Sequence, residues 1–489
     1  MSVGTDMTWT RARAVLGSLV AALVTPGCRD SVAPPAPVTV TAVSPASGPL
    51  AGGTNVTITG GNFANVTSVT IGGSELGSRT VVTATQITGT TLAASELGAS
   101  DVVVSSSSNG SGTCKGCFRY LLPVLARPLA AGLEHTCALT TGGAAYCWGR
   151  NDAGQLGDGS GTNTSTPVAV SGGLTFSAIA AGFWHTCGLT TAGAVYCWGY
   201  SDQGQLGNGS TTGSLAPVAV SGGLTFSAVA IEEDARHTCG LTDAGAAYCW
   251  GQNSYGELGN GSRTSSSTPV AVLGGLTFRA IAAGGVHTCT LTTVGEAYCW
   301  GSNGRGQLGI ERGTGPETCL YGSFSYDCST VPIRVATARH WSDLAAGFVH
   351  TCGWTPGGQG YCWGYNLLGQ LGDGSTTSSA TPVAVSGALT LSAIALGRDH
   401  TCGLTIGGAP YCWGYNLLGQ LGDGSTTSSA TPVAVSGGLS FSATATGGNH
   451  SCGITSAGAV YCWGANDSGQ LGDGTTTSSA IPVAVAGWP

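Results

Sequence analysis

Short apolar runs separated by clusters of Gly, Ser, Thr and Asn occur along most of the chain. Between residues 38 and 122, apolar and polar residues alternate in runs such as Val40–Val43, Val56–Ile58 and Val69–Ile71. A period of two is typical of strands with one buried face, and regularly spaced turn signals are typical of a sandwich. The pattern predicts a small β-sandwich over residues 38–122.

A different pattern repeats seven times over residues 126–489. Its marker is His followed by Thr or Ser and then Cys, at His135, His185, His237, His287, His350, His400 and His450. Tyr-Cys-Trp-Gly follows each marker, then in most copies Gly-Gln-Leu-Gly, and usually Pro-Val-Ala-Val. In the second copy we expect strands at Ser177–Gly182, His185–Leu189, Ala194–Trp198 and Pro217–Val220. About four strands per fifty residues predict the blades of a β-propeller.

The composition excludes several classes of protein. Charged residues make up only 8% of the 489, so the Glu, Lys and Arg that cover the solvent faces of helices are missing. This excludes a helix bundle and a doubly wound α/β enzyme. The formal charge is −8 and no basic stripe is visible, so no nucleic-acid partner is expected.

Both patterns resemble known families. The strings around Val43-Ser-Pro, Gly52-Gly-Thr and Ile71-Gly-Gly resemble the immunoglobulin-like TIG/IPT domain, which is usually a spacer or a binding module in exported proteins. The seven repeats resemble those of the regulator of chromosome condensation family. The resemblance implies an all-β fold, a seven-bladed β-propeller with an N-terminal immunoglobulin-like β-sandwich. It says little about function, because propellers host unrelated activities.

Residues 1–27 have the pattern of an export signal. Two Arg precede an apolar run from Ala14 to Val24 that is too short to span a bilayer. The following Gly27-Cys28 resembles the cleavage box of bacterial lipoproteins, in which Cys28 becomes the lipidated first residue. The alternative is an ordinary secretory signal cut nearby. Residues 28–37 are Pro-rich and predict a tether, so we expect an exported chain at the bacterial cell envelope whose only membrane contact is its lipid.

The Cys count fits this interpretation, because 19 is odd and Cys28 is the one left over. In the second repeat the turn is centred midway between Cys187 and Cys197, which places them opposite each other on neighbouring strands. The alternative is a zinc site formed by the His and Cys of His-x-Cys together with the second Cys. Export of the chain and the presence of the same pair in all seven repeats favour a disulfide over zinc. For Cys114 and Cys117 the alternatives are a redox dithiol or half a metal site. The predicted disulfides are Cys137–Cys147, Cys187–Cys197, Cys239–Cys249, Cys289–Cys299, Cys352–Cys362, Cys402–Cys412, Cys452–Cys462, Cys319–Cys328 and Cys114–Cys117.

No catalytic residue, metal site or cofactor is predicted. The marker His recurs identically in every repeat, whereas a catalyst needs one asymmetric constellation, so we expect it to bond to backbone of its own or the next blade. Asp158, Asp373, Asp423 and Asp473 lie in a turn sequence that also accepts Asn, which favours a turn role over calcium binding. The recurring Tyr and Trp, such as Tyr196 and Trp198, are interpreted as packing residues rather than sugar platforms.

Residues that differ between repeats gather in two loops of each blade. Because strands alternate in direction, the loop between strands one and two and the loop between strands three and four should leave the same end of the ring. The insertion between Ile310 and Pro332 should project from that end too. Aromatic and Arg residues on a rigid face favour protein binding. The predicted binding face comprises Phe183, Trp184, Tyr200, Arg236, Tyr255, Arg305, Tyr321, Phe324, Tyr326, Phe348, Tyr365, Arg398 and Tyr415.

Three functions are consistent with these observations. The favoured one is an exported, lipid-anchored scaffold without catalytic activity that binds a protein or an envelope polymer. A glycan-active propeller enzyme would need carboxylates at the central channel, and the acidic residues cluster only at Glu232-Glu233-Asp234. Nucleotide exchange on a GTPase is implied by the name-giving family member, but export would separate this chain from cytosolic GTP.

Overall fold

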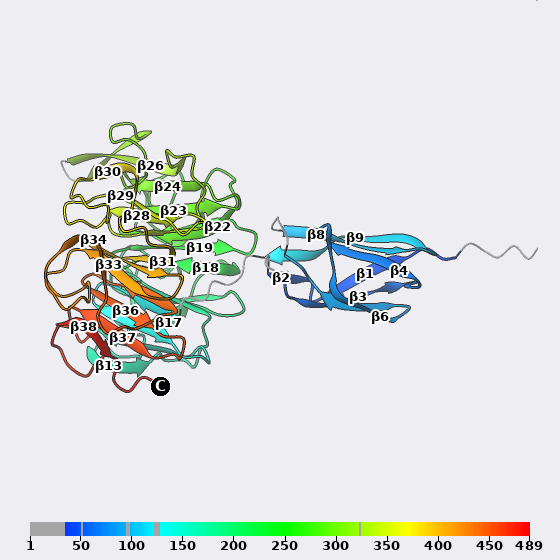
Figure 1. The fold of residues 1–489 in the computed structure, drawn as a ribbon, viewed down its shortest axis with the longest axis horizontal. Helices are drawn as coiled ribbons and strands as arrows, with labels where there is room; N and C mark the ends of the chain where they lie inside the picture. Colours follow the sequence, from blue (N-terminus) through cyan, green and yellow to red (C-terminus); the bar gives the residue numbers. More distant parts are fainter. Residues whose placement is uncertain (1–34, 50–51, 94–97, 122–127, 322–323) are drawn as a thin grey trace, which may run out of the picture.

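The computed structural model describes residues 35–49, 52–93, 98–121, 128–321 and 324–489. None of the described residues lies in a helix, which confirms the predicted all-β class. The export signal and Cys28 lie outside the described residues. Figure 1 shows strands throughout both domains.

The N-terminal domain is a sandwich of two sheets. The central strands bury one face, as in β3, where Val56 and Ile58 are buried and their neighbours are not. These side chains and Ile87 pack with Val104 and Phe118 in one core. The strand orders are β1 (Thr39–Ser44), β3 (Asn55–Gly61), β7 (Gln86–Thr90), β6 (Gly77–Thr83), and β2 (Ser47–Pro49), β9 (Gly110–Leu121), β8 (Gly98–Ser106), β4 (Val66–Ile71), β5 (Ser74–Glu75).

The C-terminal domain consists of seven sheets in chain order, which we number blades 1 to 7. Every blade is built from one contiguous stretch of chain. The strands are β10 (Leu129–Ala131), β11 (His135–Leu139), β12 (Ala145–Gly149), β13 (Thr164–Ala169); β14 (Ala178–Ala181), β15 (His185–Leu189), β16 (Val195–Gly199), β17 (Ser214–Ala219); β18 (Phe226–Ala230), β19 (His237–Thr242), β20 (Ala247–Gly251), β21 (Ser266–Ala271); β22 (Phe278–Ala283), β23 (His287–Thr292), β24 (Ala297–Ser302), β25 (Glu317–Tyr321), β26 (Phe324–Arg334); β27 (Asp343–Ala346), β28 (His350–Trp354), β29 (Gly360–Gly364), β30 (Ser379–Ala384); β31 (Leu391–Leu396), β32 (His400–Thr405), β33 (Pro410–Gly414), β34 (Ser429–Ala434); β35 (Ala443–Thr446), β36 (His450–Ile454), β37 (Val460–Gly464) and β38 (Ser479–Ala484).

Disulfides join the second and third strands of every blade. Cys187 of β15 lies opposite Cys197 of β16, with their Cα atoms 4.0 Å apart, and both are fully buried. The other six blades carry the equivalent bond. The sandwich carries Cys114–Cys117. The structure thus holds the nine pairs that spacing predicts, with each blade disulfide inside the hydrophobic core between neighbouring blades.

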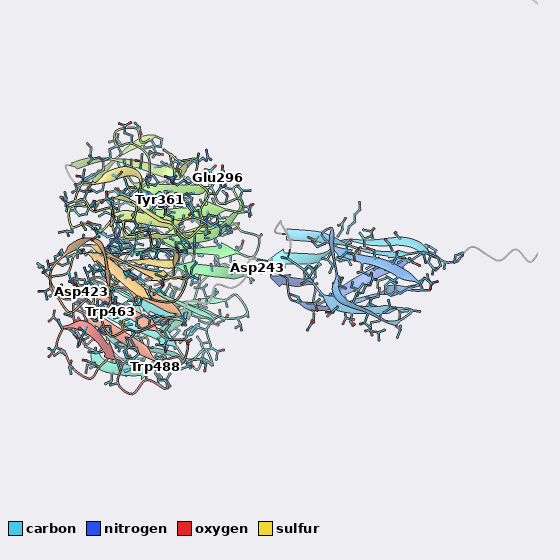
Figure 2. The ribbon with its side chains drawn as sticks, viewed as in Figure 1. Asp243, Glu296, Tyr361, Asp423, Trp463 and Trp488 are labelled. Carbon is cyan, nitrogen blue, oxygen red and sulfur yellow. A yellow bond between two sulfur atoms is a disulfide. The ribbon has the colours of Figure 1, made fainter. Side chains whose placement is uncertain are left out.

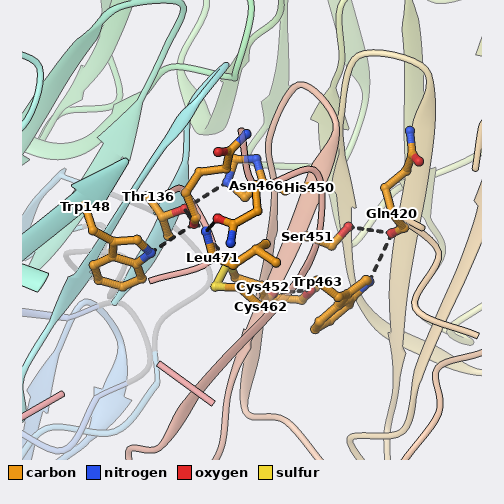
Figure 3. The surroundings of a disulfide bond; sticks show 12 residues. Thr136, Trp148, Gln420, His450, Ser451, Cys452, Cys462, Trp463, Asn466 and Leu471 are labelled. Atoms are coloured by element: carbon orange, nitrogen blue, oxygen red, sulfur yellow. Dashed lines mark hydrogen bonds between the residues drawn. A yellow bond between two sulfur atoms is a disulfide. The ribbon is translucent and has the colours of Figure 1, made fainter. Parts of the chain in front are cut away.

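Neighbouring blades are joined by a Trp and by a close backbone approach. Trp148 of blade 1 donates from Nε1 to the Gln470 carbonyl of blade 7, at 2.9 Å. The same bond recurs at every blade boundary. Gly472 lies against the Trp148 ring with a φ of +71°, and a Cβ there would come within 2.6 Å of the indole nitrogen. This boundary between the last and first blades closes the ring (Figure 3).

The C-terminus strengthens that closing boundary. Trp488, labelled in Figure 2, packs edge-on against Tyr146 and Trp148 of blade 1, with ring centroids 6.0 Å apart in both pairs. Its Nε1 donates to the Gly458 carbonyl of blade 7 at 2.8 Å. Since β35 to β38 and β10 to β13 form separate sheets, side chains rather than an exchanged strand close the ring.

Candidate binding face of the propeller

Two loops of each blade leave the ring at the same end. We call the loop between the first and second strands the short loop, and the loop between the third and fourth strands the long loop. In blade 2, the first residue of the long loop, Tyr200, donates its backbone N–H to the carbonyl of Trp184 in the short loop, at 2.8 Å. The equivalent bond is present in all seven blades, at 2.8–3.0 Å. The surface formed by both loops is called the loop face below.

The seven marker His lie beneath this face as part of the framework. His185 bonds through Nε2 to the hydroxyl of Thr238 in the next blade, at 3.0 Å, and Thr238 donates to the Gln205 carbonyl. Because the hydroxyl proton goes to that carbonyl, the ring nitrogen Nε2 is the donor in this bond. The arrangement recurs around the ring and ends with His450 on Thr136 (Figure 3).

These His are inaccessible to a substrate. Each is at most 1% exposed, and burial lowers the pKa of each to about 3. The geometry therefore supports a structural role for them. The Nε2 partner of each marker His is a side-chain hydroxyl of the next blade, so the expectation of a backbone partner is wrong. This hydroxyl belongs to the Thr or Ser that directly follows the marker His of that next blade.

Arg and aromatic side chains of the loop face pair across blade boundaries. The Arg236 guanidinium of blade 3 lies 4.2 Å from the Phe183 ring of blade 2. Arg305 lies 5.2 Å from the ring of Tyr365 in blade 5, and Arg398 of blade 6 lies 5.5 Å from the ring of Phe348 in blade 5. Such contacts stabilise a boundary and fix the positions of both side chains.

Three of the predicted residues, Phe183, Trp184 and Tyr200, form one cluster of rings in mutual contact. In blade 2 the rings of Phe183 and Trp184 lie 4.5 Å apart, and Trp184 meets Tyr200 edge-on at 5.6 Å. Arg150 of blade 1, which was outside the predicted set, lies 4.8 Å from the Trp184 ring and forms ion pairs with Glu134 and Asp152.

The insertion of blade 4 forms a hairpin on the outer edge of that sheet. Strand β26 takes the fourth position and β25 adds a fifth, with Cys319 and Cys328 joined across them. Tyr326 contacts Tyr255 of the blade 3 long loop edge-on at 6.2 Å, so the hairpin reaches the loop face. The side chains of Tyr321 and Phe324 lie outside the described residues.

The most exposed apolar residues of the face are Leu rather than aromatic. Phe183, Trp184, Tyr365 and Tyr415 are half-buried at the boundaries, because they are packed between loops. Leu367 and Leu417 are 60% and 62% exposed. They are the third residues of the long loops of blades 5 and 6. They were missed from the sequence, although Asn-Leu-Leu-Gly in an otherwise polar loop is a usable signal.

Buried Asn side chains hold the long loops in shape. In blade 7, Asn466 donates from Nδ2 to the Asp473 carboxylate at 3.2 Å. Its Oδ1 accepts from the Leu471 N–H (Figure 3). Asp473 also accepts from the backbone and hydroxyl of Thr475. The recurring Asp thus stabilises a loop. Within the described residues, no three His, Cys, Asp or Glu are placed to hold a metal ion.

The short loop of blade 3 is longer than those of the other blades and contains a buried cluster of acidic residues. Glu233 is fully buried, and burial together with the charge of Asp234 raises its pKa well above the usual value. Asp234 pairs with Arg398 of blade 6 at 3.6 Å, so this loop contacts the far side of the ring. A cavity of about 290 Å³, lined by first strands such as β14 and β31 and by Glu232, occupies the centre.

Comparisons with known proteins agree with this architecture. Residues 37–120 match the IPT/TIG domain, residues 129–155 and 176–205 match the RCC1 repeat, and residues 215–488 match the RCC1-like domain. The described residues include no helix long and apolar enough to cross a bilayer.

Among individual proteins, the ultraviolet-B receptor UVR8 of Arabidopsis thaliana is 30% identical over 262 residues. That alignment covers 50% of this chain and 55% of the receptor, so the chain spans about half the length of this curated relative.

Two solved structures share the fold. Prp20p of Saccharomyces cerevisiae, studied with its binding to Gsp1p and histones, has a TM-score of 0.62 and 20% identity over 74% of this chain and 87% of its own. Human WBSCR16 has a TM-score of 0.58 and 22% identity over 69% of this chain and 89% of its own. The RCC1-like match alone covers more than half of the 489 residues, and the chain belongs to the family of proteins with an RCC1-like domain.

Proposed function

We propose that this protein is an exported binding scaffold without catalytic activity, which engages a protein partner or an envelope polymer through the loop face. The observation that carries the proposal is the gathering of unlike side chains at one end of a repetitive ring. Exposed Leu367 and Leu417 and four Arg–aromatic pairs lie there, on loops held by buried Asn and disulfide-linked strands. Rigid loops lose little entropy on binding, which favours recognition.

A protein partner is the first choice. Aromatic rings and Arg are the side chains that protein interfaces use as anchors, and an exposed Leu adds apolar surface that a partner can bury. Prp20p, with the same fold, binds Gsp1p and histones according to the work on its structure, which supports a protein as the class of partner. The formal charge of −8 disfavours nucleic acid.

Binding is tested by affinity capture with the full chain from the envelope of its own cells. Leu367→Ala combined with Leu417→Ala should lower the yield of one defined partner at least about tenfold, since burying an exposed Leu side chain contributes about 1.5–3 kcal/mol. The matched control is Ile406→Ala, because Ile406 is 73% exposed on the β32–β33 turn at the opposite end of the blade. Equal losses in both variants would contradict the proposal.

Export and lipid attachment at Cys28 are a separate part of the proposal. Mass spectrometry of the membrane fraction should find the N-terminal peptide beginning at a diacylated Cys28. Cys28→Ser should move the protein to the soluble fraction, because a lipid chain supplies about 0.8 kcal/mol per buried CH₂. An unmodified Cys28 within an intact N-terminus would remove this part.

A glycan-active enzyme remains the second candidate, because carboxyl groups do meet near the axis. Glu233 and Asp234 approach Asp399 closely enough to influence one another's pKa values. Glu233 is fully buried and Asp234 is only 8% exposed, however, so a sugar cannot reach them in this conformation. If the protein turns over a glycan and Glu233→Gln retains that activity, these carboxyl groups are not catalytic. If Glu233→Gln abolishes a measurable turnover, the result favours the enzyme as the function.

A further inference from the structure

A cavity between blades 1 and 2 opens within the loop face. Its volume is about 400 Å³, and its walls include Arg150, Gln155, Trp184, Tyr200 and Leu215. Two N–H groups on this wall, Nε2 of Gln155 and Nε1 of Trp184, have no hydrogen-bond partner among the described residues. Gln155 is fully buried, so bulk water does not compensate its amide.

The orientation of the Gln155 amide follows from its own contacts. Its Oε1 accepts from the Ala153 N–H at 3.0 Å, so the side chain cannot be turned over without losing that bond. The NH₂ group is therefore the part left without a partner. An unpaired buried donor costs about 1–3 kcal/mol, which an acceptor entering the cavity would recover.

Other blade boundaries show how such a donor is normally satisfied. In blade 5, Gln370 donates from Nε2 to Asp399 of blade 6 at 3.5 Å, and in blade 6, Gln420 donates to Asn449 of blade 7 at 3.4 Å. Asp399 and Asn449 both directly precede a marker His, and Trp184 has this position in blade 2. Trp has no acceptor, so the substitution removes one partner and adds a second donor.

We infer that this cavity receives an amide carbonyl of a polypeptide, from a Gln or Asn side chain or from a loop backbone, as the anchor of the partner proposed above. The Gln155 amide lacks an acceptor, which a carbonyl oxygen supplies, and such an oxygen has a second lone pair for the Trp184 N–H. A carboxylate fits less well, because Asp152 lines the cavity and Arg150 is already paired with Asp152 and Glu134.

The aromatic wall favours a polypeptide over a sugar. Arg150 lies over the Trp184 ring, and Phe183 packs against the same ring at 4.5 Å. The ring is thus occupied by protein groups and offers no open platform for a pyranose. Ala153 and the half-exposed Leu215 complete an apolar wall that accommodates the methylenes of a Gln side chain.

The test uses the full chain with ¹⁵N-labelled Trp, whose indole N–H signals are followed by NMR, with the Trp184 signal assigned by its loss in Trp184→Phe. The probe is N-acetyl-glutamine N-methylamide, and a trimer of N-acetylglucosamine is the second arm. The capped amino acid should shift the Trp184 signal downfield and saturably, without moving the signals of the seven Trp at the blade boundaries. Gln155→Met should weaken this response at least about tenfold, as expected for one lost hydrogen bond. Gln420→Met, which removes the same amide at a boundary where the donor has its partner, should leave it unchanged.

The outcomes separate this inference from the function on which it rests. No shift with either probe, or a response to the trimer at lower concentration than to the capped amino acid, would overturn it. An equal effect of Gln155→Met and Gln420→Met would overturn it as well. If the probe fails while Leu367→Ala with Leu417→Ala still abolishes partner capture, the binding scaffold stands and only the amide anchor is wrong.

Discussion

At the scale of single residues, one repeat departs from the other six at a buried position of the framework. Glu257 occupies the position that Gln holds in the other six blades. It accepts from the Tyr255 N–H at 2.8 Å as the Gln side chains do, yet it is 1% exposed, and burial raises its pKa to about 8. The framework thus contains a carboxyl group that is protonated in the folded protein at neutral pH.

Glu257→Gln should stabilise the protein at neutral pH. The folded pKa lies above the unfolded value near 4.5, so the stability that Glu257 supports is complete below pH 4.5 and is lost as pH rises toward 8. The gain in the free energy of unfolding should be near zero at pH 4.5 and on the order of 1–3 kcal/mol at pH 7. Urea denaturation at both pH values measures it, and an equal gain at both would contradict the assigned cause.

At the scale of elements, the second and third strands of a blade form the unit that carries most of its buried contacts. All five residues of β15 are buried, and Cys187 and Cys197 take part in the hydrophobic core shared with the next blade. The first strands are short and rich in Ala, as in β14, because seven of them crowd around the axis. Each disulfide therefore constrains the strand pair on which two blade boundaries depend.

Replacing Cys187 and Cys197 together by Ala should lower the free energy of unfolding by about 2–3 kcal/mol, since the bond closes a loop of ten residues in the unfolded chain. Chemical denaturation under oxidising conditions measures the loss. Replacing Cys114 and Cys117 in the sandwich by Ala provides the control and should leave propeller unfolding unchanged. Identical propeller stability in the Cys187/Cys197 variant would show that the blade does not depend on the bond.

Much of the strand arrangement within a blade could be predicted from the sequence. The marker His, the paired Cys and Tyr-Cys-Trp-Gly place the second and third strands within a residue, since the central turn and the period of two fix their register. The partner of the marker His was mispredicted in kind: the next blade was among the expected positions, but the bonded group there is a Thr or Ser hydroxyl, 51 residues or more away, and not backbone. The half-buried state of Phe183 and Trp184 was equally hidden, because Arg236 and Arg150 cover them from neighbouring blades.

At the scale of the molecule, the ring is closed by the same contacts that join its inner blades. Trp148, Thr136 and Gly472 reproduce between blades 7 and 1 what every other boundary has, and Trp488 is added there. A closed ring leaves no large sheet face unpaired, so the loop face is held rigid around its whole circumference.

Gly472→Ala should weaken the closing boundary. A Cβ at this position would lie 2.6 Å from the Trp148 indole nitrogen, whereas Gly474, two residues on, has a φ of +85° and no neighbour nearer than 4.0 Å. Both substitutions strain a left-handed residue by about 1 kcal/mol. Gly472→Ala should cost a further 1–3 kcal/mol in a thermal or denaturant melt, by analogy with overpacked cores. Equal costs for the two variants would contradict tight packing at the boundary.

Acid should unfold the propeller steeply. The seven marker His have folded pKa values of about 3 against 6.5 in the unfolded chain, so unfolding takes up protons as pH falls from 6.5 toward 3. Each adds about 1.4 kcal/mol per pH unit to the loss of stability. Glu257, Glu233, Asp234 and Asp399 act in the opposite direction because their pKa values are raised, but they are four groups against seven. Denaturation midpoints from pH 7 to pH 4 measure the slope, and a flat profile would contradict burial of neutral His.

The central claim is that one end of this ring binds a partner, and site-specific photo-crosslinking tests it most directly. A photoreactive residue replaces Leu367 on the loop face, or Ile406 at the opposite end, in the full chain within its own cells. We predict a crosslinked product of one discrete mass from position 367, and none from position 406 at comparable protein levels. Discrete products from position 406 with none from position 367 would contradict the account.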